Sequence, residues 1–123
     1  MLERFYRSDL GRRVAQAADV HREFKFSLLV DAGRFLAGGD GEQVLLQGVV
    51  DCFFEEDGQL VLLDFKTDRV RAGEEEAAAA GYREQLEAYA YALRRITGKP
   101  VREKAVFFLR TGCAVYMQDR KFF

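Results

Sequence analysis

The sequence has 123 residues, 49% of them hydrophobic, with 19 basic and 20 acidic residues and a formal net charge of −1. This length allows one domain with its own hydrophobic core. The near-neutral charge argues against nucleic-acid binding through overall charge, so any DNA contact has to come from a local patch or from other domains of a larger protein. Two cysteines are too few for a four-thiolate metal cluster. No apolar run has the length of a membrane helix, and we expect a cytoplasmic protein without a membrane contact.

The N-terminal quarter predicts one helix and one strand. Residues 8–18 place apolar side chains at helical spacing after an initial serine, a favoured N-cap residue. Arg12 and Arg13 are expected on the solvated face of this helix, where they could also contact phosphate. Residues 23–30 alternate between apolar and polar and predict a strand. The only histidine, His21, lies just before this strand, where a lone histidine is more often a surface residue than a metal ligand.

A second strand carries two exceptions to its apolar pattern. Residues 31–41 are rich in glycine and predict a turn-rich connection into it. The strand itself, 43–54, is long and apolar, and Gly48 predicts a bulge or a close approach of another group. Asp51 interrupts the apolar run, and such local exceptions concentrate at functional sites. A hairpin turn at 55–58 then leads into a third strand.

The third strand ends in the stretch around which the predicted site is built. Its apolar core, 60–63, is followed by Asp64, Phe65 and Lys66. Because side chains alternate along a strand, Asp64 and Lys66 face one side of the sheet and Phe65 faces the other. Antiparallel pairing around the hairpin allows Asp51 to face the same side as Asp64.

The C-terminal half predicts a helix and two strands. Residues 74–97 predict a long helix in which Gly81 is a candidate break, so that 82–96 is the solid part. Its apolar stripe extends to Ile96, and Gly98 predicts the C-cap. Two further strands are expected at 101–109 and 113–117. The predicted order of elements is therefore αβββαββ.

The acids and the lysine support two interpretations. Asp64 and Lys66 alone could form a buried salt bridge, which accounts for most isolated pairs at this spacing. With Asp51 on the neighbouring strand, an oxygen-rich site for Mg²⁺ or Mn²⁺ is favoured, to which the carbonyl of Phe65 could add a ligand. Such a metal polarises a phosphodiester oxygen and lowers the pKa of a bound water. Lys66 could position or help deprotonate that water, or neutralise charge developing on the phosphate.

Three motifs together resemble the RecB-type nuclease domain of the PD-(D/E)XK superfamily, most closely the C-terminal nuclease domain of AddA/RecB helicase–nucleases. They are G-x-x-D at 48–51, D-F-K-T-D at 64–68 and Y-x-x-Q-L-x-x-Y at 82–89. The matching motifs lie within 48–93 and are specific as a set, whereas D-x-K alone is weak. The resemblance implies an α/β (α+β) fold with a restriction-endonuclease-like core, in which helices flank a mixed central sheet of about five strands.

The resemblance also implies roles for individual residues. The acids of its first two motifs bind the metal. The catalytic set carried over to this sequence is Asp51, Asp64, Lys66, Gln85 and Tyr89. Tyr82 and Arg69 are expected to contact DNA. Ordinary helix packing is the alternative for Tyr82 and Tyr89.

The implied function is Mg²⁺- or Mn²⁺-dependent hydrolysis of DNA by the nuclease domain of an ATP-dependent helicase–exonuclease that acts in double-strand-break repair. Its partners would be DNA, a helicase motor in the same full-length chain and a second helicase–nuclease subunit. Residues 1–123 would be a single truncated nuclease domain, because nothing matches the family's upstream metal-ligand histidine. No Walker A sequence is present, so the helicase motor expected from the resemblance is not found in these residues. Two alternatives remain: a non-catalytic DNA-binding or scaffold module, and a restriction-like endonuclease acting alone, against which the near-neutral charge counts.

Overall fold

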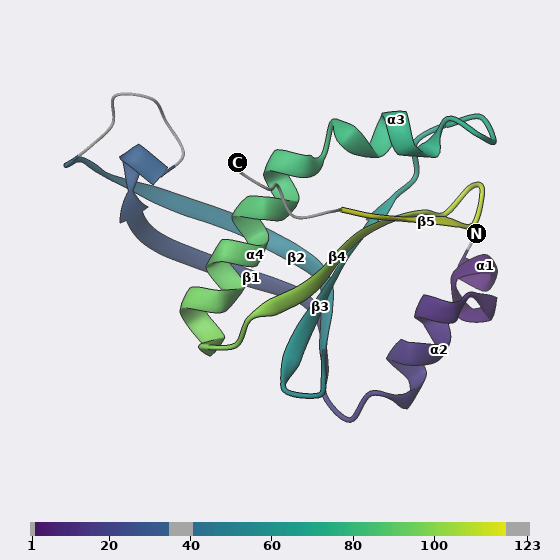
Figure 1. The fold of residues 1–123 in the computed structure, drawn as a ribbon, viewed down its shortest axis with the longest axis horizontal. Helices are drawn as coiled ribbons and strands as arrows, with labels where there is room; N and C mark the ends of the chain where they lie inside the picture. The colour runs from purple at the N-terminus through teal and green to yellow at the C-terminus, as the bar shows by residue number, and fades with distance from the viewer. Residues whose placement is uncertain (1, 35–40, 118–123) are drawn as a thin grey trace, which may run out of the picture.

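A computed structural model describes residues 2–34 and 41–117 of the chain (Figure 1), so residues 35–40 of the predicted glycine-rich connection lie outside the described residues. The elements are α1 (Leu2–Arg7), α2 (Asp9–Gln16), β1 (Val20–Asp31), the short 3-10 helix η1 (Ala32–Arg34), β2 (Gln43–Glu56), β3 (Gln59–Lys66), α3 (Glu75–Ala80), α4 (Arg83–Thr97), β4 (Val101–Phe108) and β5 (Cys113–Tyr116). The strands form one sheet in the order β1-β2-β3-β4-β5. Only the β3–β4 pair is parallel; the other pairs are antiparallel. This mixed sheet with flanking helices confirms the predicted fold class.

A tight hairpin joins β2 to β3. Its two turn residues, Asp57 and Gly58, have φ values of 52° and 79°. An Asp-Gly pair favours this left-handed backbone, and the resulting turn matches the twist of the flanking strands. The turn is shorter than the predicted 55–58, because Glu55 and Glu56 already pair with β3. The hairpin therefore fixes the register between β2 and β3 from its first residues.

Helices cover both faces of the sheet and create two separate hydrophobic cores (Figure 1). On one face, Leu86 of α4 is fully buried in a core that includes Phe108. On the other face, Phe5 of α1 and Leu10 of α2 pack in a core that includes Phe107. Phe107 and Phe108 are neighbours in β4 and serve opposite cores, as the alternation of side chains along a strand requires.

The N-terminal segment forms two helices where one was predicted. Ser8 is the N-cap of α2, and its Oγ accepts a hydrogen bond from the backbone N–H of Gly11 at 3.0 Å. The preceding helix α1 was not predicted; its single buried residue is Phe5. Gly11 lets the two helices meet, since a Cβ there would lie 2.0 Å from the carbonyl oxygen of Phe5.

Arg13 does not lie on the solvated face, and that prediction is wrong. Its guanidinium donates to both carboxylate oxygens of Glu56, at 3.0 and 2.6 Å, and also to Glu103. These bonds join α2 to β2 and β4, so Arg13 ties a helix to two strands of the sheet. Arg12 is exposed, and its one ion pair among the described residues is with Asp9 at 3.5 Å, as expected for a surface residue.

The predicted long helix breaks at Gly81, as anticipated, into α3 and α4. Gly98 ends α4 with a φ of 76°, the left-handed conformation that glycine adopts without steric cost, which confirms the predicted C-cap. The predicted apolar stripe extends too far along the helix. Leu93 is fully buried, but Ile96 is 43% exposed, because the last turn of α4 extends past the covered part of the sheet.

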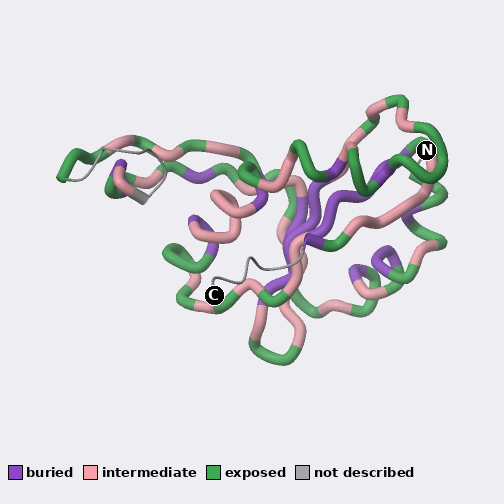
Figure 2. Tube along the Cα trace, turned by 45° about the horizontal axis from the view of Figure 1, so that its top comes forward, coloured by how far each residue is buried: buried purple, intermediate pink, exposed green. Residues whose placement is uncertain are grey.

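The β1–β2 pair extends away from the rest of the sheet as a two-stranded ribbon (Figure 2). Buried residues concentrate where β2 pairs with β3 and β3 with β4, whereas most residues in the far part of the ribbon are exposed or half-buried, with Val30 as a buried exception. Leu29 and Leu45 are cross-strand partners there and are 59% and 54% exposed. Among residues 2–34 and 41–117, no helix is long and apolar enough to cross a membrane.

Candidate active site

Asp51 and Asp64 meet where β2 and β3 separate. The last pair in the β2–β3 ladder is Cys52 with Leu63, and the next position on each strand is an aspartate. The Oδ2 of Asp51 accepts a hydrogen bond from the backbone N–H of Phe65 at 2.8 Å. The side chain of Asp51 therefore reaches across to β3 in place of the next backbone pair and holds its carboxylate beside Asp64.

The backbone opposite Asp51 is irregular. Pairing between β1 and β2 runs on both sides of this point, through Arg22 with Cys52 and Phe24 with Val50. The intervening residue of β1, Glu23, has a φ of 49°. A non-glycine residue with positive φ is uncommon and costs about 1–3 kcal/mol, and such strain clusters at functional sites. Asp51 is thus released from the β1 ladder and turned toward β3.

The Lys66 ammonium lies at the centre of the cluster. Its Nζ is 2.9 Å from the Oδ2 of Asp64 and 3.3 Å from the Oε1 of Gln85 on α4. It also lies 4.3 Å from the centre of the Tyr82 ring, within the range of a cation–π interaction. Lys66 and Asp64 therefore face the α4 side of the sheet together. Phe65 packs on the opposite side, with its ring 4.9 Å from that of Phe5.

Gln85 and Tyr89 extend this cluster along α4. The Nε2 of Gln85 donates to the Tyr89 hydroxyl at 3.2 Å, so a continuous chain of contacts runs from Lys66 through Gln85 to Tyr89. The Tyr89 ring packs edge-on against Phe26 with the ring centres 5.6 Å apart. Of the two predictions for Gly48, the structure favours the close approach, since a Cβ there would lie 2.7 Å from Tyr89 and 3.0 Å from Phe26.

Burial and neighbouring charge alter the ionisation of Asp64 and Lys66. The Asp64 side chain is only 6% exposed, and burial is the main cause that raises its pKa to about 6. Lys66 lowers that pKa and the Asp51 carboxylate raises it further. For Lys66, burial lowers the pKa, but the adjacent Asp64 carboxylate outweighs this and the pKa is raised overall. The site is therefore a carboxylate pair beside a stable cation.

The donor set fits a hard divalent cation. The Oδ2 of Asp64 is buried and accepts no hydrogen bond from any residue that the structure describes, because Lys66 approaches it from a direction that does not satisfy hydrogen-bond geometry. Two adjacent carboxylates repel each other and together favour a positive ion between them. Carboxylate oxygens are the ligands that Mg²⁺ and Mn²⁺ prefer. Within residues 2–34 and 41–117, however, no group of three acidic, histidine or cysteine side chains could hold a metal.

The remaining predicted residues lie at the periphery of the cluster. Arg69 is exposed in the loop after β3. Tyr82 is half-buried at the N-cap position of α4, with its ring toward Lys66. His21 lies at the surface, where its Nε2 is 3.2 Å from the Oδ1 of Asp19 and its ring stacks on Phe53 with the ring centres 4.6 Å apart. The backbone carbonyl of Phe65 remains a predicted ligand only.

The sequence interpretation missed one residue of the cluster, Asp68. The Tyr82 hydroxyl donates to the Oδ2 of Asp68 at 2.5 Å, and this hydrogen bond is the main cause that raises the pKa of Tyr82. Asp68 lies two residues after Lys66 and could have been suspected from that spacing. Its partner is fourteen positions away, however, so only the folded structure brings the two together.

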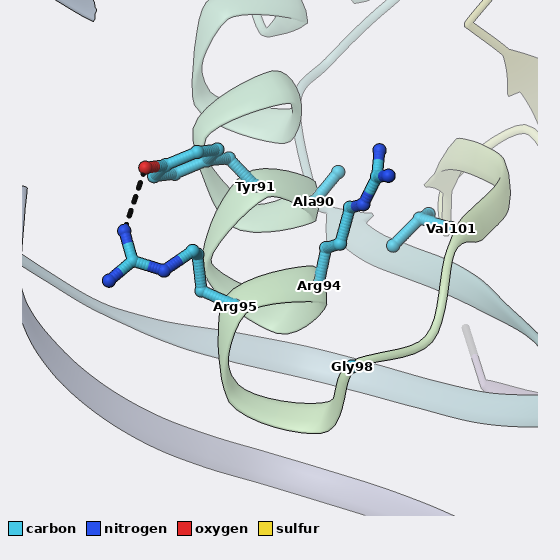
Figure 3. A pocket seen from close by; sticks show the side chains of 6 residues that line it. All are labelled: Ala90, Tyr91, Arg94, Arg95, Gly98 and Val101. Carbon is cyan, nitrogen blue, oxygen red and sulfur yellow. Dashed lines mark hydrogen bonds between the residues drawn. The ribbon is translucent and has the colours of Figure 1, made fainter.

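A surface cavity of about 650 Å³ lies away from these residues, at the C-terminal end of α4 (Figure 3). Tyr91 and Arg95 point to one side of the helix, and the Nη1 of Arg95 donates to the Tyr91 hydroxyl at 2.9 Å. Arg94 points to the other side, toward Val101. This cavity contains none of the carboxylates of the cluster, and its chemistry does not suggest a metal site.

Comparisons with known proteins give one family and a consistent set of relatives. Residues 1–121 match the family described as the PD-(D/E)XK nuclease superfamily. Proteins named as subunits of an ATP-dependent helicase/nuclease are similar to this chain, in Desulforudis audaxviator (45% identical over 112 residues, 89% of this chain and 9% of that protein), Syntrophomonas wolfei (42% over 113 residues, 91% and 9%) and Bacillus cereus strain Q1 (40% over 125 residues, 94% and 10%). The chain thus spans about a tenth of the length of these relatives.

Proposed function

The chain belongs to the PD-(D/E)XK nuclease superfamily, and we propose that it is the nuclease domain of an ATP-dependent helicase–exonuclease that hydrolyses DNA with Mg²⁺ or Mn²⁺. The observation that carries this proposal is the convergence of Asp51, Asp64 and Lys66 at one end of the β2–β3 pair. A buried salt bridge would need only Asp64 and Lys66. Asp51 adds a second acid beside the buried Asp64 carboxylate, and such a pair is costly to keep in a fold unless it has a function.

Each residue of the cluster has a defined part in this reaction. Asp51 and Asp64 would hold the metal, which when bound supplies a Lewis acid for the phosphodiester and lowers the pKa of water. Lys66 would neutralise charge that develops on the phosphate, or position or help deprotonate the attacking water. Gln85 orients Lys66, and Tyr89 in turn supports Gln85.

The wider setting of the reaction is supported only by the names of the relatives. Proteins whose names join helicase and nuclease combine two activities, so we propose that the full-length chain also contains a helicase motor and that its partner is a second helicase–nuclease subunit. Double-strand-break repair is the process that such a combination would serve. Arg69 and Tyr82 are proposed DNA contacts, since the Tyr82 ring lies 4.3 Å from the Lys66 ammonium and Arg69 is exposed in the loop that follows Lys66.

Two substitutions test the proposed chemistry in the full-length protein. Asp51→Ala removes a metal ligand and Lys66→Ala removes the cation, so each should abolish Mg²⁺-dependent cleavage of linear DNA. Thermal unfolding should show that both variants remain folded, because Asp51 and Lys66 lie at the end of the β2–β3 pair rather than within a core. If both variants cut DNA at the wild-type rate, the site assignment is wrong.

A non-catalytic DNA-binding or scaffold module is the second candidate. The observation in its favour is that the described residues offer two acidic ligands and no third. Calorimetric titration with Mn²⁺ separates the two candidates. Binding that disappears in Asp51→Asn supports the nuclease, whereas DNA binding without any metal binding by the full-length protein supports the scaffold.

A further inference from the structure

The position of the Lys66 ammonium depends on groups from three parts of the chain. Asp64, on the same strand, lies 2.9 Å from Nζ, and Gln85, on α4, lies 3.3 Å from it. The third group is the face of the Tyr82 ring at 4.3 Å. A lysine side chain is long and flexible, so its charge stays in one place only if several neighbours restrict it.

The Tyr82 ring is itself fixed at its far end. Its hydroxyl donates to Asp68 at 2.5 Å, a short and therefore strong hydrogen bond to a carboxylate. Asp68 lies in the loop that follows β3, and Tyr82 lies immediately before α4. The hydrogen bond thus joins the two ends of the segment that connects β3, which carries Lys66, to α4, which carries Gln85.

We propose that Asp68 and Tyr82 are positioning residues for Lys66. Asp68 holds the phenol, the phenol fixes the angle of the ring, and the face of the ring confines the ammonium beside Asp64. The ring attracts the cation without neutralising it, because aromatic quadrupoles accept no proton. Lys66 therefore keeps its full charge for the phosphate. This inference rests on the proposed function, since Lys66 is the group through which both residues act.

Single-turnover cleavage by the full-length protein tests the proposal. Because displacement of a catalytic group by one ångström can cost a factor of about 100, Tyr82→Leu should lower the rate about 100-fold, toward that of Lys66→Ala. Tyr82→Phe keeps the ring and loses only the bond to Asp68, so a loss of about 10-fold is expected, the same as for Asp68→Ala. Asp68→Asn can still accept the phenol proton and should recover most of the rate.

Two readouts separate positioning from a general structural role. The double variant Asp68→Ala/Tyr82→Phe should be no slower than either single variant, because both break the same bond. The Kd of Asp68→Ala for DNA, measured in EDTA, should stay within about twofold of wild type, since Asp68 is not a proposed DNA contact and the lost interaction acts on the chemical step. Tyr91→Phe is the matched control: it removes a phenol bond from the same helix, far from Lys66, and should leave the rate unchanged.

The contrary outcomes are distinct from one another. If Tyr82→Leu cuts as fast as Tyr91→Phe while Lys66→Ala is inactive, the positioning role is wrong and the proposed function stands. The positioning role is also wrong if the losses in cleavage rate of the two single variants multiply in the double variant. It is wrong too if the Tyr82 substitutions weaken only DNA affinity, which would make Tyr82 a DNA contact alone. If the wild type does not cut DNA, or Lys66→Ala cuts normally, the proposed function fails and the inference fails with it.

Discussion

Tyr89 lies so close over Gly48 that a Cβ on the glycine would be 2.7 Å from its Cε1 atom. The glycine of the G-x-x-D motif and the last tyrosine of the helix motif are therefore in direct contact. Tyr89 also accepts a hydrogen bond from Gln85, which contacts Lys66. The packing of α4 against β2 therefore requires a glycine at position 48. Through Tyr89 and Gln85, this packing also affects the position of Lys66.

Gly48→Ala should displace Tyr89 and Phe26, because both rings lie too close to accept a methyl group. We expect a loss of about 1–3 kcal/mol in the free energy of unfolding, measured with urea. Gly81→Ala is the matched control, since its Cβ would lie 3.5 Å from the nearest carbonyl oxygen and should change stability by less than about 1 kcal/mol. Equal effects of the two substitutions would refute the packing argument.

Asp64 should make stability depend on pH in the absence of metal. Its pKa is raised from 3.8 to about 6, so the folded chain holds this proton more tightly than the unfolded chain. The contribution of Asp64 to the free energy of unfolding is fully present below about pH 4. It is lost as the pH rises through about 6, by up to about 3 kcal/mol in total. Asp64→Asn should remove that loss when unfolding is measured in EDTA at pH 4.5 and 7.5.

The control for this pH dependence is Asp57→Asn, at the exposed turn of the β2–β3 hairpin. It should keep the full decrease in stability between the two pH values. A wild-type protein that is equally stable at both values would contradict the buried, proton-binding state of Asp64.

Arg13 should contribute to stability far more than its neighbour Arg12. Arg13 donates to two carboxylates and is only partly exposed, so Arg13→Ala should cost about 1–3 kcal/mol. Arg12→Ala removes one exposed ion pair and should cost less than about 0.5 kcal/mol. Arg13 lowers the pKa of Glu56, so this stabilisation is present above pH 4.5 and should disappear in acid. Similar unfolding midpoints for the two variants at pH 7 would be evidence against the network.

Arg69 is predicted to contact phosphate rather than base edges. It is exposed beside the cluster and forms no ion pair with the residues that the structure describes. Arg69→Ala should weaken DNA binding for all sequences alike and reduce the slope of log K against log salt by about 1. Arg94→Ala, at the other end of α4, is the control and should leave that slope unchanged. A normal slope for Arg69→Ala would remove this residue from the DNA-binding surface.

The sequence allowed prediction of those features that depend on local geometry. Alternation along β3 placed Asp64 and Lys66 on one side and Phe65 on the other, as observed. The left-handed backbone at Gly98 was predictable because glycine alone adopts it freely. The helix motif at 82–89 also grouped Gln85 with Tyr89, which are hydrogen-bonded in the structure.

Features that depend on distant contacts were not predictable. Arg13 pairs with Glu103, 90 positions away, and nothing near Arg13 in the sequence distinguishes it from Arg12. Helix α1 has one buried residue, Phe5, so its formation depends on the sheet it covers rather than on its own pattern. The strained backbone at Glu23 likewise has no local signal, because it results from the way Asp51 leaves the β1 ladder.

The cleavage of linear DNA by the full-length protein, compared between wild type and Asp51→Asn, decides whether this cluster is a nuclease site. Asp51→Asn keeps the size of the side chain and removes one metal-binding charge. We predict that Mg²⁺-dependent cleavage falls to background while ATP hydrolysis continues at the wild-type rate. Wild-type cleavage by Asp51→Asn, with the same dependence on Mg²⁺, would contradict the assignment of the site.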